Sequence, residues 1–376
     1  MNFFKNFFTI IVLLISFQGA YSQVLEGHVY DMQNNALQAA TVYLDGSTVA
    51  TTTDAEGYFK INGNANSRAI LIVSYMGYKT IRLENPFQHK KIKVLMEEDA
   101  ITMPEIVLQK GPFTRKEMMK AFKEQFLGNT NAGSSCKILN EDDINLYYDI
   151  ATNTLNATSH KPIKIKNSYL GYEVFFELAD FNVVYRRRSL SSFSIDKSYF
   201  SGTTFYKELS QSKKTDKRRL ASYLGSTSHF VNTIANESWD KERLALFVDG
   251  FKVDPKKYFA VSDTLGVKKI TVLKEPMKQV PIYKKETPEV SRKGQTIMIG
   301  SKEENIIGYN ETEVPFNVLF NDKHQSLADF TEKVIFVDEN GNYSPVYGVM
   351  VGGYMSSLKV GDMLPIDYYQ SVKGKY

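Results

Sequence analysis

Two acidic residues beside a glycine are the first candidates for chemistry in this sequence. They are Asp54 and Glu56 in the stretch TTDAEGYF, residues 52–59. A calcium-binding loop needs three or more closely spaced oxygen ligands, including a bidentate acid, and two acids fall short of that set. The stretch instead predicts a turn between two strands, in which Asp54 caps its own turn and Gly57 adopts a positive φ. Phe59 then points into a core.

Cys136 with His160 or His229 is the combination that would suit nucleophilic catalysis. The chain has five histidines, and none of them has the HxH or HExxH spacing of a zinc site. The zinc and general base of a metallopeptidase are therefore not expected. A lone cysteine is usually buried and inert, which favours a structural Cys136. The stretch GSTSH, residues 225–229, is not the GxSxG of a nucleophile elbow, and it falls within a helical pattern.

Nucleotide cofactors and nucleic acid are not expected partners. No GxGxxG or Walker sequence occurs, and the formal net charge is only +4. The basic clusters at 186–188 and 213–219 are candidates for phosphate contact, but solvated surface is the favoured interpretation. Tyr169, Tyr172 and Tyr354 are candidates for stacking on sugars, although strand alternation also explains them as core residues.

The N-terminal residues predict the compartment. MNFFKNFFTIIVLLISFQGAYSQ contains a lysine, an apolar run and small residues at Ala20 and Ser22, the pattern of a secretory signal peptide cut before Gln23. The alternative, a membrane anchor, needs an apolar run of roughly 20 residues. No cysteine stands directly after the cleavage site, so a lipoprotein is not expected. No later segment is long and apolar enough to cross a membrane. The sequence therefore predicts an exported protein that is periplasmic or associated with the outer membrane.

The elements that must position these residues begin with short, alternating strands. With 376 residues, the chain suggests about two domains and a leader. Between Gln23 and Gln109 the alternation predicts a β-sandwich of about seven strands. The expected strands are 25–30, 40–44, 49–53, 58–61, 70–75, 92–96 and 106–108.

Four motifs in this region carry a family resemblance. They are GHVYD at 27–31, ATV at 40–42, TDAEGYF at 53–59 and SYMGY at 74–78. The region resembles the carboxypeptidase-regulatory-like domain of exported Bacteroidota proteins, which implies a transthyretin-like sandwich. One departure is Ala36-Leu37, where the family usually has a proline. By resemblance, such domains precede outer-membrane transporters or hydrolases and mediate assembly with them.

The remainder of the chain predicts a larger domain. Thr114 and Glu117 form a capping box that begins a helix closed by Gly128. An antiparallel meander is expected over 137–187, one helix over 215–234, and strands at 269–273, 295–299, 314–320 and 334–337. Asn340-Gly341 predicts a hairpin. This half resembles the region that follows the regulatory-like domain in related exported proteins, and that resemblance supplies no catalytic residues.

The sequence therefore predicts a mainly β protein: a signal peptide (1–22), a transthyretin-like seven-strand β-sandwich (23–109) and a strand-rich α+β domain (114–376). We expect a non-enzymatic cell-envelope protein that binds or scaffolds an envelope or outer-membrane protein, for example as an accessory subunit of a transport or assembly machine. No catalytic, cofactor-binding or metal-binding residue is assigned, and no cofactor is expected. The alternatives are a hydrolase with its site in the second domain, and a glycan-binding module.

Overall fold

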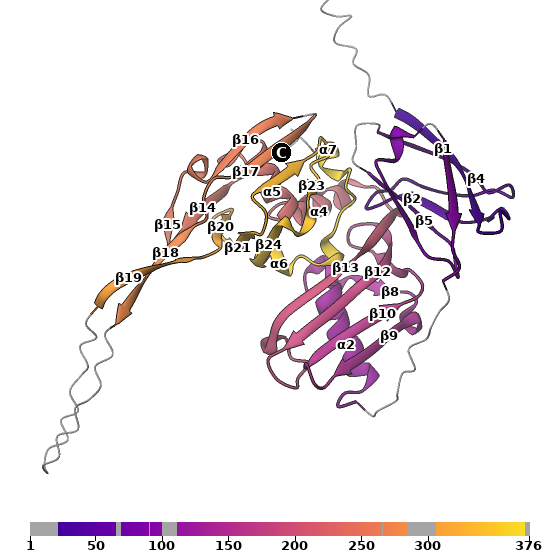
Figure 1. Cartoon of the computed structure of the whole chain (residues 1–376). Coiled ribbons are helices and arrows are strands. Elements are labelled where there is room, and N and C mark those ends of the chain that lie inside the picture. Colours follow the sequence, from indigo (N-terminus) through magenta and orange to yellow (C-terminus); the bar gives the residue numbers. More distant parts are fainter. Residues whose placement is uncertain are drawn as a thin grey trace, which may run out of the picture. The chain divides into compact units, whose positions relative to one another are not determined.

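The fold was analysed in a computed structural model that describes residues 22–64, 69–89, 91–99, 111–264, 266–283 and 306–372. The chain forms two units (Figure 1). Unit 1 comprises Met1–Tyr223, Asp338–Gly341 and Leu358–Tyr376, and unit 2 comprises Leu224–Val337 and Asn342–Ser357. The signal peptide and the strands expected at 106–108 and 295–299 lie outside the described residues.

The N-terminal part of unit 1 is a β-sandwich of a three-stranded and a four-stranded sheet. One sheet has the order β4-β1-β7 and the other β3-β2-β5-β6. Alternate residues such as Val29, Phe59 and Leu71 point between the sheets and are at most 1% exposed. The strand Ile81–Glu84 was missed in the sequence, although its burial alternates. The strands are β1 (Ser22–Asp31), β2 (Thr41–Leu44), β3 (Ala50–Thr52), β4 (Tyr58–Asn64), β5 (Ile70–Ser74), β6 (Ile81–Glu84) and β7 (Ile92–Met96).

The TTDAEGYF stretch is the turn between β3 and β4. Asp54 Oδ1 accepts hydrogen bonds from the backbone N–H groups of Glu56 (3.1 Å) and Tyr58 (2.8 Å). Gly57 has a φ of +74°, a conformation that side chains disfavour. No group of three metal-ligating side chains occurs among the described residues. The turn prediction is therefore confirmed.

A six-stranded antiparallel sheet forms the second part of unit 1. Its long strand β12 pairs with β13 along one edge, and with β11 and then β10 along the other. The strands are β8 (Cys136–Ile138), β9 (Ile144–Asp149), β10 (Thr154–Ser159), β11 (Ile163–Asn167), β12 (Tyr172–Tyr185) and β13 (Ile195–Glu208). This is the meander expected over 137–187, extended by β13.

Helix α2 (Arg115–Phe126) packs against this sheet through aromatic side chains. The predicted capping box is present: Thr114 accepts from Glu117 N–H, and the Glu117 carboxylate accepts from Thr114 N–H. Phe122 lies 4.7 Å from Phe181, and Phe126 lies 5.0 Å from Phe176, between ring centroids. Both phenylalanines of the helix are fully buried. The core of this part therefore forms between one helix and one face of the sheet.

The turn after β2 joins the sandwich to the edge of β13 within unit 1. Gly46 N–H donates to the carbonyl of Thr204 (2.6 Å), and Tyr206 N–H donates to the carbonyl of Ser47 (2.8 Å). The Asp45 carboxylate accepts from Thr204 N–H at 2.8 Å. These bonds satisfy part of an otherwise open strand edge.

The C-terminal segment returns to unit 1 through a contact between two glycines. A Cβ on Gly361 would lie 2.4 Å from Gly133 Cα and 2.6 Å from the carbonyl oxygen of Leu127, so only glycine fits. Asn167 donates to the Gly361 carbonyl (2.8 Å), and Asp362 accepts from Thr130 (2.6 Å). The segment includes a short 3-10 turn, Val360–Asp362, and contacts α3 (Asn131–Ser134). Helix α7 (Tyr368–Val372) follows.

Unit 2 contains a five-stranded sheet, a four-stranded sheet and a two-stranded hairpin. Their orders are β15-β14-β20-β21-β24, β16-β17-β22-β23 and β18-β19. The first two sheets share one core with helix α5 (Thr227–Ala235), and this core includes Phe230, Ile270 and Phe316. The strands are β14 (Leu244–Val248), β15 (Phe251–Lys252), β16 (Phe259–Thr264), β17 (Val267–Val272), β18 (Met277–Tyr283), β19 (Ile306–Glu313), β20 (Phe316–Phe320), β21 (His324–Phe330), β22 (Val334–Val337), β23 (Tyr343–Ser344) and β24 (Val349–Gly353). A short helix, α6 (Tyr354–Ser357), follows β24.

Of two sequence predictions for a hairpin and a helix, the first is confirmed and the second is wrong. The Asn340-Gly341 hairpin is confirmed, because β22 pairs with β23 in antiparallel register, although β23 is only two residues long. The single helix expected over 215–234 is wrong. Gly225 adopts a φ of +80°, which ends the helical path, and Ser226 caps a new helix by accepting from His229 N–H. The result is two helices, α4 (Lys213–Tyr223) and α5 (Thr227–Ala235).

His229 is a buried polar group at the start of α5. Its side chain is 1% exposed, and its Nδ1 accepts from Gly225 N–H at 2.9 Å. The neutral ring therefore carries its proton on Nε2, which lies 3.2 Å from the Glu242 carboxylate. Burial lowers the pKa of His229, and Glu242 opposes that effect only in part.

We expect the glycine contact to govern the stability of unit 1. Gly361→Ala should lower the free energy of unfolding by about 3 kcal/mol or more, because the methyl group meets backbone atoms that have no space to move. Gly111→Ala is the control, since a Cβ there meets nothing within 4 Å, and should change stability by less than about 0.5 kcal/mol. Equal urea midpoints for the two variants would contradict the role given to this contact.

We expect His229 to make unit 2 less stable in mild acid. The pKa of His229 is lowered on folding, so the unfolded state binds a proton more readily than the folded state. The contribution of His229 to the free energy of unfolding is therefore complete above about pH 6.5 and declines below that value. The decline should not exceed about 1.4 kcal/mol per pH unit. Urea unfolding between pH 8 and pH 5 measures it. His229→Gln should flatten the slope more than His324→Gln, whose pKa is also lowered but which is less buried. Identical slopes in all three proteins would refute the assignment.

Candidate functional site

Cys136 begins β8 and is partly buried. Its Sγ donates to the carbonyl of Ala132 at 3.3 Å. Burial, with a further contribution from the negative charge of Asp362, raises the pKa of the thiol to about 12. The side chain borders an open groove of about 880 Å³ along α2. These properties are those of an unreactive thiol.

Within unit 1 the structure separates Cys136 from His160. Cys136 pairs in register with Asn167 at one end of β11, whereas His160 precedes the other end of that strand. At about 3.3 Å per residue, the strand separates them by roughly 13 Å. His160 is exposed, so these two residues do not form the Cys–His pair of the hydrolase alternative. His229 belongs to unit 2, where it is buried against Glu242.

The three tyrosines considered for sugar stacking already have partners. Tyr172 is 4% exposed and lies under the Arg219 guanidinium, 4.0 Å from its ring centroid. Tyr169 is covered in the same way by Arg218 at 4.2 Å. Tyr354 stacks on His324 with ring centroids 4.1 Å apart. The sugar-stacking hypothesis therefore has no support at these three positions.

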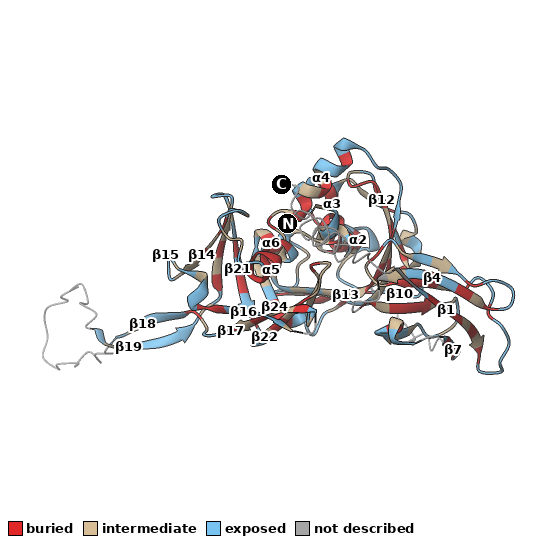
Figure 2. Cartoon of the chain, turned by 90° about the horizontal axis from the view of Figure 1, so that it is seen from above, coloured by how far each residue is buried: buried red, intermediate tan, exposed pale blue. Residues whose placement is uncertain are grey.

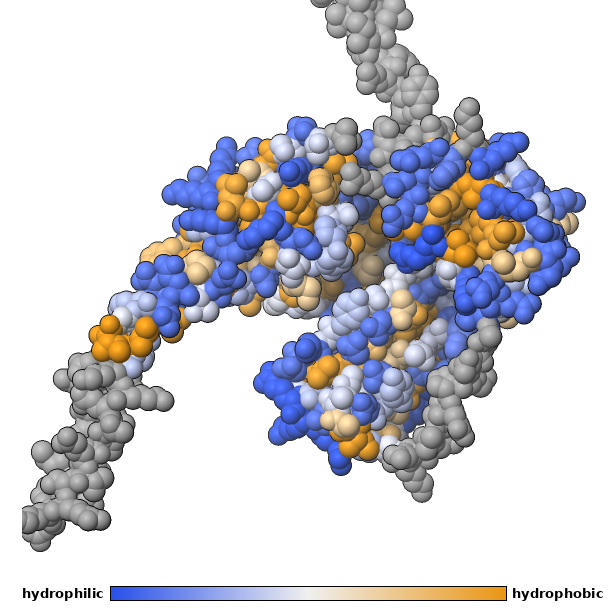
Figure 3. Space-filling view, in the orientation of Figure 1, coloured by the Kyte–Doolittle hydropathy of each residue, from blue (hydrophilic) through white to orange (hydrophobic). Residues whose placement is uncertain are grey.

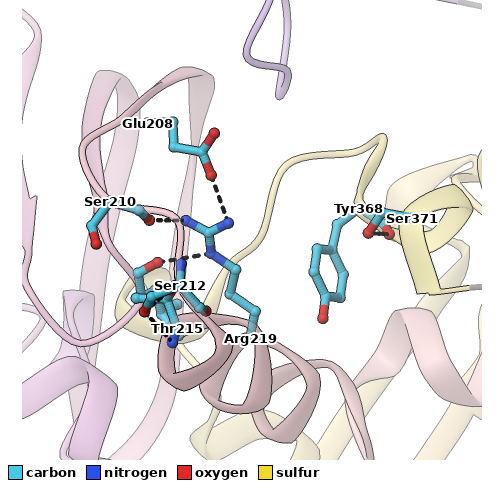
Figure 4. Close-up of polar contacts among 8 residues, drawn as sticks. Glu208, Ser210, Ser212, Thr215, Arg219, Tyr368 and Ser371 are labelled. Atoms are coloured by element: carbon cyan, nitrogen blue, oxygen red, sulfur yellow. Dashed lines mark hydrogen bonds and ion pairs between the residues drawn. The ribbon is translucent and has the colours of Figure 1, made fainter. Parts of the chain in front are cut away.

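Arg219 ends the basic cluster at 213–219, and it is an internal clamp (Figure 4). It is 4% exposed, and its guanidinium donates to the carbonyls of Leu170 (2.8 Å) and Ser210 (2.9 Å) and to the Glu208 carboxylate (2.7 Å). A buried arginine that directs three of its five N–H donors at fixed acceptors has little left for a phosphate. By contrast, the arginines at 186–188 are exposed in the β12–β13 loop.

The feature most typical of a binding surface is the hairpin of β18 and β19. Within the part of the chain that the structure describes, its strands pair only with each other. The hairpin is exposed over most of its length (Figure 2). Apolar side chains gather at its outer end (Figure 3). The most exposed are Ile306 (48%), Ile307 (63%) and Tyr309 (58%).

The apolar residues occupy both faces of this hairpin. By strand alternation Val280 and Ile282 share one face, and Tyr283 lies on the other, where the register also places Ile306 and Tyr309. A two-stranded hairpin with no buried face is marginally stable by itself. Exposed apolar surface of this kind typically marks an interaction site. Sequence reasoning missed β18 and β19, although Pro281 within an apolar run is a signal for an edge strand.

No helix among the described residues is long and apolar enough to cross a membrane.

Three solved structures illustrate how limited the structural likenesses are. A cohesin–X-dockerin complex from Acetivibrio cellulolyticus is 18% identical over 29% of this chain and 78% of its own, with a TM-score of 0.20. A protein of unknown function from Bacteroides fragilis, described as membrane-associated, is 11% identical over 51% and 83%, with a TM-score of 0.17. A 9R-lipoxygenase from Cyanothece is 11% identical over 57% and 48%, with a TM-score of 0.18. At these TM-scores none of them informs the function of this chain.

The sandwich itself has a clear family match. No curated protein matches the chain as a whole. Residues 25–108 match the model of the CarboxypepD_reg-like domain, a range that spans β1 to β7. The resemblance seen in the four sequence motifs is thereby confirmed. The N-terminal β-sandwich of this protein is a carboxypeptidase-regulatory-like domain.

Proposed function

We propose that this protein is a non-enzymatic, exported cell-envelope protein that binds or scaffolds a partner protein at the outer membrane or in the periplasm. The observation that carries the proposal is the β18–β19 hairpin, whose apolar residues are exposed on both faces. The signal-peptide pattern and the regulatory-like domain support export and an envelope location.

The hairpin edges point to the way a partner binds. Pro281 lies in β18 opposite Tyr309. Proline is tolerated in a strand where its missing N–H would face away from the neighbouring strand, so the outer edge of β18 lacks a donor there. β19 has no proline from Ile306 to Glu313, and its outer edge keeps every donor. We therefore assign the outer edge of β19 as the docking edge, to which an extended segment of the partner adds as a third strand.

The chemistry of the candidate catalytic residues supports a binding role. The high pKa of the Cys136 thiol keeps it protonated at neutral pH, and His160 lies at the other end of the neighbouring strand. Glu242 orients His229, but the remaining ring nitrogen accepts a backbone N–H. A general base needs that nitrogen free to accept a proton from its substrate.

Proline substitutions on the two edges test the docking mode. Residues that face each other alternate in hydrogen-bonding type. Gln279 and Glu311 therefore direct their N–H groups outward, as Tyr309 does opposite Pro281. Glu311→Pro should therefore remove an outward donor from β19 and leave the hairpin intact. Gln279→Pro is the matched control on β18. Affinity purification from detergent-solubilised envelopes measures the partner, and Glu311→Pro should recover at least about tenfold less of it, the loss expected for about 1.4 kcal/mol.

Unchanged melting temperatures would show that both proline variants are folded. Equal recovery by the wild type and both variants would contradict docking at the β19 edge. If the wild type retained no envelope protein above a mock column, the proposed function itself would be refuted.

Thiol labelling tests the non-enzymatic assignment. With a pKa of about 12, the Cys136 thiolate is a fraction of about 10⁻⁴ at pH 8, so labelling of the folded protein should be slow and labelling after denaturation rapid. Cys136→Ser should lower stability, because it replaces a partly buried thiol, and should change no hydrolytic activity. Fast stoichiometric alkylation of the native protein, coupled to loss of a measured hydrolysis, would favour the hydrolase alternative.

A further inference from the structure

A second candidate site lies in unit 2, in a pocket beside the only tryptophan of the chain. The pocket has a volume of about 370 Å³, within the range of roughly 300–1,000 Å³ that small-molecule sites occupy. It lies between the loop after α5, strand β14 and the 3-10 turn Pro255–Lys257. Its inner wall is apolar and includes Leu246 and Phe259 beside Trp239.

Trp239 is held in a defined position. Its ring packs edge-on against Phe230 (6.0 Å between centroids) and offset-parallel to Phe259 (6.4 Å). Its carbonyl accepts from Leu244 N–H at 3.0 Å. The ring is partly buried, and it lines the pocket. A rigid aromatic surface that needs no reorganisation is an efficient recognition element.

Charged residues of both signs surround this aromatic surface. The set contains three acids and three lysines, namely Glu237, Asp240, Asp254, Lys241, Lys252 and Lys256. Lys256 Nζ lies 3.8 Å from Glu237 Oε1, and both side chains are exposed. The Asp254 carboxylate already accepts a hydrogen bond from the backbone N–H of Lys256. Asp240 has no hydrogen-bond partner for its carboxylate among the described residues, so it is free to accept from a ligand.

We propose that this pocket binds a neutral saccharide. The C–H face of a pyranose ring is apolar and suits the indole of Trp239, whereas its hydroxyl groups both donate and accept hydrogen bonds. Carboxylates and ammonium groups side by side match that dual character. Their charges cancel, so the pocket offers no field that would favour a polyanion. The inference is independent of the hairpin and of the proposed docking function.

The single tryptophan makes the test direct. Because Trp239 is the only tryptophan of the chain, tryptophan emission reports on this pocket alone. We expect saturable changes in that emission when maltotriose, cellotriose or chitotriose is added at millimolar concentration. Sulfated heparin oligosaccharide and a basic or acidic hexapeptide serve as the competing ligand classes.

Matched variants locate the binding. Asp240→Asn should weaken binding by about tenfold, because it removes a charged acceptor. Asp322→Asn makes the same chemical change at an exposed site outside the pocket and should leave binding unchanged. Trp239→Phe, measured by calorimetry, should weaken binding while Phe230 and Phe259 keep an aromatic neighbour.

Several outcomes would overturn the proposal. One is the absence of an emission change and of calorimetric heat with all three neutral trisaccharides at 20 mM, an order-of-magnitude excess over a weak millimolar site. Another is equal weakening by Asp240→Asn and Asp322→Asn. Saturable binding of the sulfated sugar or of a peptide in place of the neutral sugars would assign the pocket to a different class of ligand.

Discussion

The architecture depends on the backbone contact between Gly361 and Gly133. Unit 1 is not continuous in sequence. The chain leaves it after Tyr223, re-enters it briefly at Asp338–Gly341 and returns to it from Leu358 onward. The returning segment finds its place because two residues without side chains let the backbones approach more closely than any Cβ permits. Asn167 and Asp362 then satisfy the polar groups that this approach buries. The contact thereby fixes the turn Val360–Asp362 against α3.

Arg219 also holds together segments of unit 1 that are distant in the sequence. From within α4 it donates to the carbonyl of Leu170 before β12, to the carboxylate of Glu208 at the end of β13 and to the carbonyl of Ser210 after it. In the sequence it belongs to a basic run that looks like solvated surface. Only the tertiary arrangement shows that one member of that run is internal. The structure therefore explains why a charge cluster need not be a ligand site.

Local sequence signals predicted the local structure well. The Asp54 turn and the Thr114–Glu117 capping box depend on bonds within four residues, and the Asn340-Gly341 hairpin pairs residues at most eight apart. The helix expected over 215–234 failed because an apolar periodicity continues across Gly225, while the backbone reverses there. The β18–β19 hairpin was missed because its apolar residues face no core, and periodicity detects burial. The surroundings of Cys136 and Trp239 could not be predicted from local sequence patterns, because they depend on contacts between segments that are distant in the sequence.

The division of the chain has a mechanical consequence. The polypeptide passes between the two units four times, after Tyr223, Val337, Gly341 and Ser357. A pulling force applied to the β18–β19 hairpin would therefore reach unit 1 through four covalent strands in parallel, and no single linker would carry the whole load. Severing one of these connections would leave three others to hold the units together.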